Sequence, residues 1–210
     1  MCHPMRTFSR RQGQTNKPVA YYSRTVGDLV ACESQHERRF LMLADWHDDV
    51  VHIAAQPFTL EFPPGSELRS HTPDFALILR DGGVLVPDVK WPTDAIKEPV
   101  VRRHTIVRDV LARAGMQHVV WTDAPQAVTE NLAFFAAARV PTGLLRDLAP
   151  RLTQGFRPGI TVEALTTDVS RTHNLATMTL LVVLRRLLWD RVFRVDMLVP
   201  FTLRSELHMS

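Results

Sequence analysis

Hydrophobic positions in the first two thirds of the chain alternate between helical spacing and short continuous runs. The spacing of Phe40, Leu41 and Ala44, behind cap-like residues that begin at Ser34, predicts a helix over 34–46. The short runs are bounded by Gly, Pro or Asp, which is typical of strands. The predicted order is helix 34–46, strands 50–53, 58–62, 75–79 and 84–89, helix 98–114, strand 118–121 and helix 126–139. This order predicts an α/β fold in which a mixed sheet is flanked by helices.

The segment Val140-Pro141-Thr142-Gly143 predicts a domain boundary, with one domain over 28–140 and a second over 141–210. Within the second, apolar spacing predicts two helices and then two strands. Such an order is typical of a small winged-helix-like domain that binds DNA or protein, and a helical packing domain with a terminal hairpin is the alternative. The predicted elements are helices 161–169 and 175–189 and strands 192–198 and 201–203.

Composition excludes several classes of protein. The 210 residues are 45% hydrophobic and 22% charged, an ordinary globular balance. No apolar run approaches the ~18 residues that span a bilayer, and Met1 to Lys17 lack the apolar core of a secretory signal. Two cysteines, Cys2 and Cys32, cannot form a disulfide framework or a four-thiolate zinc site. We therefore expect a reduced, cytoplasmic protein with no membrane partner.

The net charge of +3 is unevenly distributed along the chain. Residues 1–27 form a predicted basic N-terminal arm with five basic and no acidic residues. Residues 28–139 hold 11 basic and 16 acidic residues, and residues 140–210 hold nine basic and six acidic residues. An acidic middle between basic flanks is compatible with DNA binding through the flanks, and a solvated N-terminal tail is the alternative for the arm.

The main candidate for chemistry is a hairpin that carries Asp74 on one arm and Asp88 and Lys90 on the other. Asp88 and Lys90 lie two positions apart and so share one face of a strand. A two-residue loop would place Asp74 on the opposite face, whereas the three-residue loop Asp81-Gly82-Gly83 would pair Asp74 with Lys90. Whether Asp74 shares a face with Asp88 and Lys90 therefore depends on the length of the loop.

Two carboxylates and an ammonium on one face would suit Mg²⁺-assisted hydrolysis of a phosphodiester. Magnesium prefers carboxylate oxygens and activates bound water, and a lysine can orient or deprotonate that water. The alternative is that these residues only mark strand ends at the surface. Glu37 also has two interpretations, because it fits a capping box with Ser34 and yet lies on the apolar stripe of its helix. The histidines show no zinc-ligand spacing and are expected at surface or core positions: His47, His52, His71, His104 and His118.

Five ordered segments together resemble the TnsA endonuclease family, the partner nucleases of heteromeric cut-and-paste transposases. The resemblance covers roughly residues 20–125. The ordered set is far more specific than a PD…DxK motif alone. The segments are residues 33–40, Asp45-Trp46 to Val50-Val51, Gln56-Pro57-Phe58, Thr72-Pro73-Asp74-Phe75 and Asp88-Val89-Lys90.

The resemblance implies a restriction-endonuclease-like core and Mg²⁺-dependent cleavage at the 5′ ends of a transposon. It implies a two-metal site in which Mn²⁺ can substitute, with Glu37, Asp74 and Asp88 as metal ligands and Lys90 as the catalytic lysine. The implied partners are transposon-end DNA, a DDE-type transposase that acts on the 3′ ends, and an AAA+ regulator that contacts the C-terminal region. The chain departs from the family pattern at Asp88, where Glu or Gln is usual, and at Pro87, which predicts a bulge or a sheet edge.

Two other functions stay open at this point. One is a stand-alone restriction or repair nuclease with the same core. The other is a non-catalytic adaptor that binds DNA or a protein partner, and the departures at Pro87 and Asp88 favour it.

Overall fold

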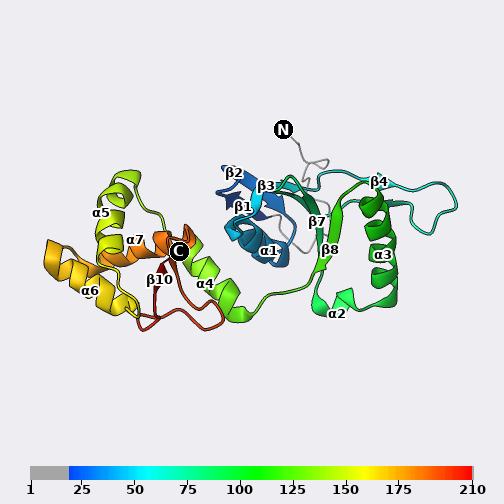
Figure 1. Cartoon of the computed structure of the whole chain (residues 1–210). Helices are drawn as coiled ribbons and strands as arrows, with labels where there is room; N and C mark the ends of the chain where they lie inside the picture. Colours follow the sequence, from blue (N-terminus) through cyan, green and yellow to red (C-terminus); the bar gives the residue numbers. More distant parts are fainter. Residues whose placement is uncertain (1–18, 210) are drawn as a thin grey trace. The chain divides into compact units, whose positions relative to one another are not determined.

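A computed structural model describes residues 19–209 of the chain. This part is a mixed α/β structure with a four-stranded mixed sheet and seven helices (Figure 1). The chain divides after Asp123 into two compact units, earlier than the boundary predicted at 140. No helix among residues 19–209 is both long and apolar enough to cross a bilayer.

The first unit is organised around a sheet with the strand order β3-β6-β7-β8. Three strands pair antiparallel as a meander, and the fourth runs parallel to β7. A parallel neighbour requires a crossover connection, which the two helices between β7 and β8 supply. The elements are β3 (Val50–Ala55), β6 (Phe75–Leu79), β7 (Val84–Val89), α2 (Pro92–Ala95), α3 (Glu98–Arg113) and β8 (Gln117–Trp121).

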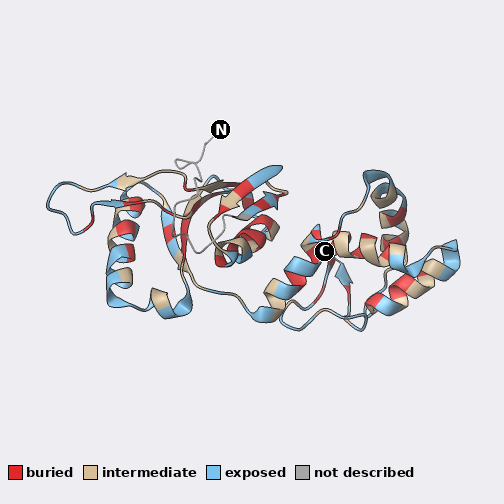
Figure 2. Cartoon of the chain, turned by 180° about the vertical axis from the view of Figure 1, so that it is seen from behind, coloured by how far each residue is buried: buried red, intermediate tan, exposed pale blue. Residues whose placement is uncertain are grey.

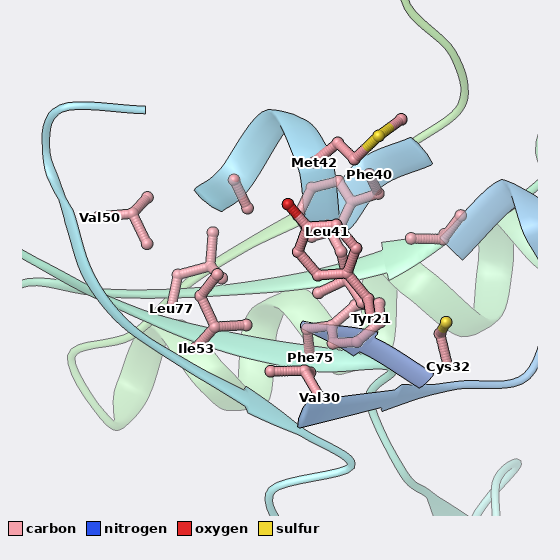
Figure 3. Close-up of a cluster of buried hydrophobic side chains, with 12 residues drawn as sticks. Tyr21, Val30, Cys32, Phe40, Leu41, Met42, Val50, Ile53, Phe75 and Leu77 are labelled. Atoms are coloured by element: carbon pink, nitrogen blue, oxygen red, sulfur yellow. The ribbon is translucent and has the colours of Figure 1, made fainter. Parts of the chain in front are cut away.

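Helices cover both faces of this sheet. Alternate residues of β6 and β7 face opposite sides, so Phe75, Leu77 and Val89 pack with α1 (Gln35–Trp46). On the other side Val86 packs with Val107 and Leu111 of α3. Figure 1 shows the two helices on either side of the sheet, and Figure 3 shows the α1 side of the core. Buried residues lie mainly where helices and strands meet (Figure 2).

The β6–β7 hairpin has a three-residue loop, but one position earlier than predicted. Leu79 N donates to Gly83 O at 2.8 Å, which leaves Arg80, Asp81 and Gly82 as the loop. Gly82 takes φ +87°, the left-handed conformation that the third position of such a loop requires. The observed register pairs Leu77 with Leu85. The predicted pairing of Arg80 with Val84 differs from it by two positions along β7. The shift is by an even number of positions, so the predicted shared face is preserved.

Pro87 ends the pairing of β6 with β7. Continued by two more positions, the register would pair Phe75 with Pro87, where a backbone N–H is needed and proline has none. The ladder between the two strands stops after Leu77 and Leu85. The edge-strand alternative for Pro87 was wrong, because β7 lies inside the sheet and Pro87 pairs in parallel register with Val119 of β8.

An N-terminal hairpin, which the sequence did not predict, packs on α1. It consists of β1 (Val19–Ser23) and β2 (Asp28–Cys32), so part of the predicted arm over 1–27 is ordered sheet. The buried Asp45 carboxylate of α1 accepts hydrogen bonds from Tyr21 Oη at 2.8 Å and Ser23 Oγ at 2.7 Å. It also accepts from the backbone N–H groups of Arg24 and Thr25 at 3.1 and 2.8 Å. Residues 1–18 of the predicted arm lie outside the described residues.

A long loop after β3 carries a two-stranded sheet of β4 (Leu60–Glu61) and β5 (Ser70–His71). The predicted strand over 58–62 is therefore shorter than expected. β5 lies directly before the Thr72-Pro73-Asp74 segment, so it fixes the entry of the chain into β6.

The second unit is helical with a small terminal sheet. α7 is its central helix, packed against α4, α5 and α6 (Figure 1). The predicted strand 192–198 is reduced to two residues, and the predicted strand 201–203 is absent from the described residues, because β9 pairs with a strand nearer the C-terminus. An isolated bridge joins Thr161 to Glu206. The elements are α4 (Gln126–Ala136), α5 (Thr142–Gln154), α6 (Val162–His173), α7 (Thr177–Trp189), β9 (Phe193–Arg194) and β10 (His208–Met209).

The Asp45 contacts predict a strong effect on stability. In Asp45→Asn, an amide group replaces an oxygen that accepts buried hydrogen bonds, so at least one donor loses its partner. We expect the free energy of unfolding to fall by about 2–4 kcal/mol in urea titrations. Asp49→Asn is the control, since Asp49 is exposed, and it should change stability by less than about 0.5 kcal/mol. Equal losses in the two variants would contradict the anchoring role of Asp45.

Candidate functional site

Asp74 and Lys90 form an ion pair at one end of β6 and β7. Lys90 Nζ lies 3.2 Å from Asp74 Oδ2, and the same oxygen accepts a hydrogen bond from Val89 N at 2.7 Å. Lys90 Nζ also donates to Val89 O at 3.0 Å. The side chains of Lys90 and Asp74 are 32% and 23% exposed, so solvent and ligands reach the pair. Burial raises the pKa of Asp74, and Lys90 opposes this rise.

Glu37 fulfils both interpretations of its position. Ser34 caps α1 by accepting a hydrogen bond from Glu37 N at 3.0 Å, and Ser34 Oγ donates to Glu37 Oε1 at 3.0 Å. Glu37 Oε2 accepts from Glu33 N at 2.7 Å. Burial raises the pKa of Glu37, and the nearby charge of Asp74 raises it further. Glu37 is therefore both the capping residue of α1 and an electrostatic neighbour of Asp74.

Residues far apart in the sequence hold this pair from several sides. Gln56 N donates to Asp74 O at 2.9 Å, and Gln56 Nε2 donates to Glu33 Oε1 at 2.9 Å. Gln56 adopts φ +44°, a conformation that costs energy for a residue other than glycine and that occurs most often at functional sites. His36 Nε2 lies 3.2 Å from Lys90 O, and its ring stacks on Trp91 with centroids 4.0 Å apart.

Asp88 lies in a different environment, surrounded by three histidines. Its Oδ2 atom lies 2.9 Å from His71 Nε2, 2.9 Å from His118 Nε2 and 3.4 Å from His104 Nδ1. The four side chains come from β5, β7, α3 and β8, and all are buried. Burial by itself would raise the pKa of Asp88, but hydrogen bonds from the imidazoles hold it well below its usual range.

Several polar atoms of this cluster have no hydrogen-bond partner among the described residues. These are Asp88 Oδ1, His118 Nδ1 and both ring nitrogens of His104. Buried polar atoms are nearly always paired in folded proteins, so such a concentration calls for an explanation. One nitrogen or oxygen from each of the four residues lies within 4.8 Å of the others, which is a set that could hold a metal ion.

The structure thus pairs Asp74 with Lys90, leaves Glu37 within electrostatic reach of Asp74, and turns Asp88 Oδ2 toward the histidines. His71, His104 and His118 are buried, as the core alternative predicted, and they converge on one carboxylate, which the sequence did not predict. A search for local ligand spacing missed them because they come from three different elements. The sequence did carry a signal that two of these histidines are buried. His104 precedes the buried Val107 and Leu111 by three and seven positions, so it lies on the buried face of α3. His118 lies between exposed residues of β8 and so points to the buried side of that strand.

Searches for related proteins return no match to the sequence, neither to a protein-family model nor to a curated protein. Arguments about function therefore rest on the residues and their geometry.

The two contacts of Glu37 can be separated by substitution. Ser34→Ala removes the cap, and we expect the free energy of unfolding to fall by about 1 kcal/mol. Glu37→Gln keeps an oxygen for Glu33 N and an amide that can donate to Ser34 Oγ, so the loss should stay below about 0.5 kcal/mol. Urea titrations of both variants measure the difference. A larger loss in Glu37→Gln than in Ser34→Ala would show that the charge of Glu37 stabilises the fold.

Proposed function

We propose that this chain is a metal-dependent DNA endonuclease subunit of a heteromeric transposase, of the TnsA type. The observation that carries the proposal is the solvent-accessible Asp74–Lys90 pair, with Glu37 within electrostatic reach of Asp74. The surrounding contacts use other residues of the segments that carry the resemblance. Gln56 links Asp74 to Glu33, and His36 contacts the backbone of Lys90.

The arrangement of the first unit supports a restriction-endonuclease-like core. A helix that carries the glutamate precedes an antiparallel meander, and a crossover helix leads to a fourth strand parallel to β7. This order of elements places the two arms of the PD…DxK motif on adjacent strands, which is the geometry that the proposed chemistry requires.

The donor set of the site fits a hard divalent cation. Glu37 and Asp74 supply carboxylate oxygens, and burial together with their mutual repulsion raises the pKa of Glu37. A cation bound between them would relieve this repulsion. Mg²⁺, or Mn²⁺ in its place, supplies a water of lowered pKa and stabilises charge on the phosphorus centre.

The protein side chains then have separate roles. Glu37 and Asp74 would hold the cation, and Asp88 would contribute only through Oδ1, the oxygen that the imidazoles leave without a partner. Lys90 Nζ would orient the attacking water or accept its proton, after exchange of its contact with Asp74. Val89 N holds Asp74 Oδ2 in place on the adjacent strand.

The second unit supports the winged-helix part of the proposal. Four helices precede a sheet of β9 and β10, and the Thr161–Glu206 bridge adds a third extended segment between α5 and α6. The central helix α7 buries much of its surface in the unit, with Leu180, Val183 and Leu184 fully enclosed. We propose that this unit contacts protein partners, among them an AAA+ regulator, beside the DDE-type transposase that completes the reaction.

One observation favours a second function, that of a non-catalytic adaptor. The histidines occupy Asp88 Oδ2, so the site has one oxygen fewer for Mg²⁺ than the family pattern implies. Titration calorimetry separates the two functions. An adaptor would bind DNA or its partner without binding Mg²⁺, whereas the nuclease would bind the cation in the presence of DNA.

The nuclease proposal predicts loss of cleavage from single substitutions. The full chain would be purified together with a DDE-type transposase encoded beside its gene and incubated with transposon-end DNA and Mg²⁺. We expect breaks at the 5′ ends, and we expect Asp74→Asn, Lys90→Ala and Glu37→Gln to lower the rate about 100-fold or more. Breaks would be mapped on denaturing gels.

Matched controls come from exposed residues of the same types. Asp49→Asn and Lys97→Ala should cut at the wild-type rate, since both side chains are exposed and lie outside the site. Wild-type cleavage by Asp74→Asn and Lys90→Ala would refute the site. Intact DNA binding with no cleavage by the wild-type complex would select the adaptor.

The basic residues before β1 predict a salt effect on DNA binding. Arg6, Arg10, Arg11 and Lys17 lie within residues 1–18, with no acidic residue. Replacing all four with Gln leaves the β1–β2 hairpin intact. If they contact phosphates, the slope of log K against log salt should become shallower by about 0.9 for each lost contact. Fluorescence anisotropy at several salt concentrations measures the slope, and an unchanged slope would contradict their role.

A further inference from the structure

We propose that His71, Asp88, His104 and His118 form a closed transition-metal site that binds Zn²⁺ and fixes the end of β7. The inference rests on the geometry of this cluster and does not use the proposed nuclease activity. It concerns a different set of donors from the Glu37–Asp74 pair.

The separations within the cluster are close to those of a tetrahedral zinc site, with two of them shorter. Zinc binds imidazole nitrogen and carboxylate oxygen at about 2.0–2.2 Å, which places neighbouring ligand atoms roughly 3.4 Å apart. The nitrogens of His71, His118 and His104 lie 2.9, 2.9 and 3.4 Å from Asp88 Oδ2. Because all four donor atoms lie within 4.8 Å of one another, small side-chain rotations suffice to surround an ion.

Hydrogen bonds within the cluster do not give every buried polar atom a partner. Three imidazoles face one carboxylate oxygen, and one of the facing atoms, His104 Nδ1, has no hydrogen-bond partner among the described residues. An ion at the centre would make ligands of the atoms that face one another. It would also supply the positive charge that a buried carboxylate needs without requiring a protonated histidine.

The donor chemistry selects the metal. Three imidazoles and one carboxylate suit Zn²⁺, Co²⁺ or Ni²⁺, whereas Mg²⁺ requires oxygen donors and retains several waters. Four protein ligands without an open position are typical of a structural site. All four residues are buried, with exposures of 7, 1, 2 and 6% for His71, Asp88, His104 and His118, which leaves no room for a substrate at the ion.

The position of the site gives it a consequence for the rest of the unit. It would tie β5 and α3 to β7 and β8, which already pair as neighbouring strands of the sheet. Asp88 lies two residues before Lys90 and one before Val89, whose N–H holds Asp74. The ion would therefore fix the strand that positions the Asp74–Lys90 pair.

Cobalt is the first probe. The full chain, stripped of metal with a chelator, would be titrated with Co²⁺. We expect the intense visible absorption of tetrahedral Co²⁺, saturating near one ion per chain, and displacement by Zn²⁺ but not by Mg²⁺. His104→Gln should abolish this spectrum. His173→Ala, an exposed histidine of the second unit, should retain it, and so should Asp74→Asn and Lys90→Ala, which separates this site from the proposed nuclease site.

Thermal unfolding is the second probe, and it works with Zn²⁺, which has no visible absorption. At free Zn²⁺ a hundredfold above its dissociation constant, the midpoint of the first unit should rise by roughly 5–10 °C in the wild type and stay constant in folded His104→Gln. The proposal is overturned if the wild type shows neither the spectrum nor the shift. It is equally overturned if folded His104→Gln takes up the ion as the wild type does.

Discussion

The register of β6 against β7 is the constraint on which the functional geometry depends. The three-residue loop Arg80-Asp81-Gly82 fixes this register, and the positive φ of Gly82 allows the loop to close. A slip by one residue would turn every side chain of β7 to the opposite face. Lys90 would then leave Asp74, and Asp88 would enter the apolar core against α1. Glycine at position 82 thus controls two sets of polar contacts at the far end of the hairpin.

From that register, one strand supplies two chemically different environments. Lys90 meets a carboxylate that is 23% exposed, whereas Asp88 meets three buried imidazoles. The difference follows from depth in the sheet, because Asp88 lies between β8 and α3 while Lys90 lies just beyond the last paired residue of β7. Hard oxygen donors gather at the exposed end and nitrogen donors at the buried one, so the two places favour different cations.

The sequence predicted the elements whose signals are local. The strands 75–79 and 84–89 match the structure, and the helix at 98–114 ends one residue earlier than predicted, with Gly115 directly after its cap. What failed depended on distant contacts. β1 and β2 are stabilised by Asp45 on α1, which no short window reveals. The helix α5 was missed because Gly143 and Pro150 interrupt its pattern, although Leu148 and Leu152 are buried at helical spacing.

The histidine cluster also accounts for the identity of residue 88. The TnsA pattern that the sequence resembles has Glu or Gln there, and Asp88 departs from it with a shorter side chain. In the structure this length holds Oδ2 at 2.9 Å from both His71 and His118. A glutamate would extend one methylene further into a cluster whose four side chains are at most 7% exposed, which would force the imidazoles apart. The short side chain of aspartate is therefore the one that fits among the three histidines.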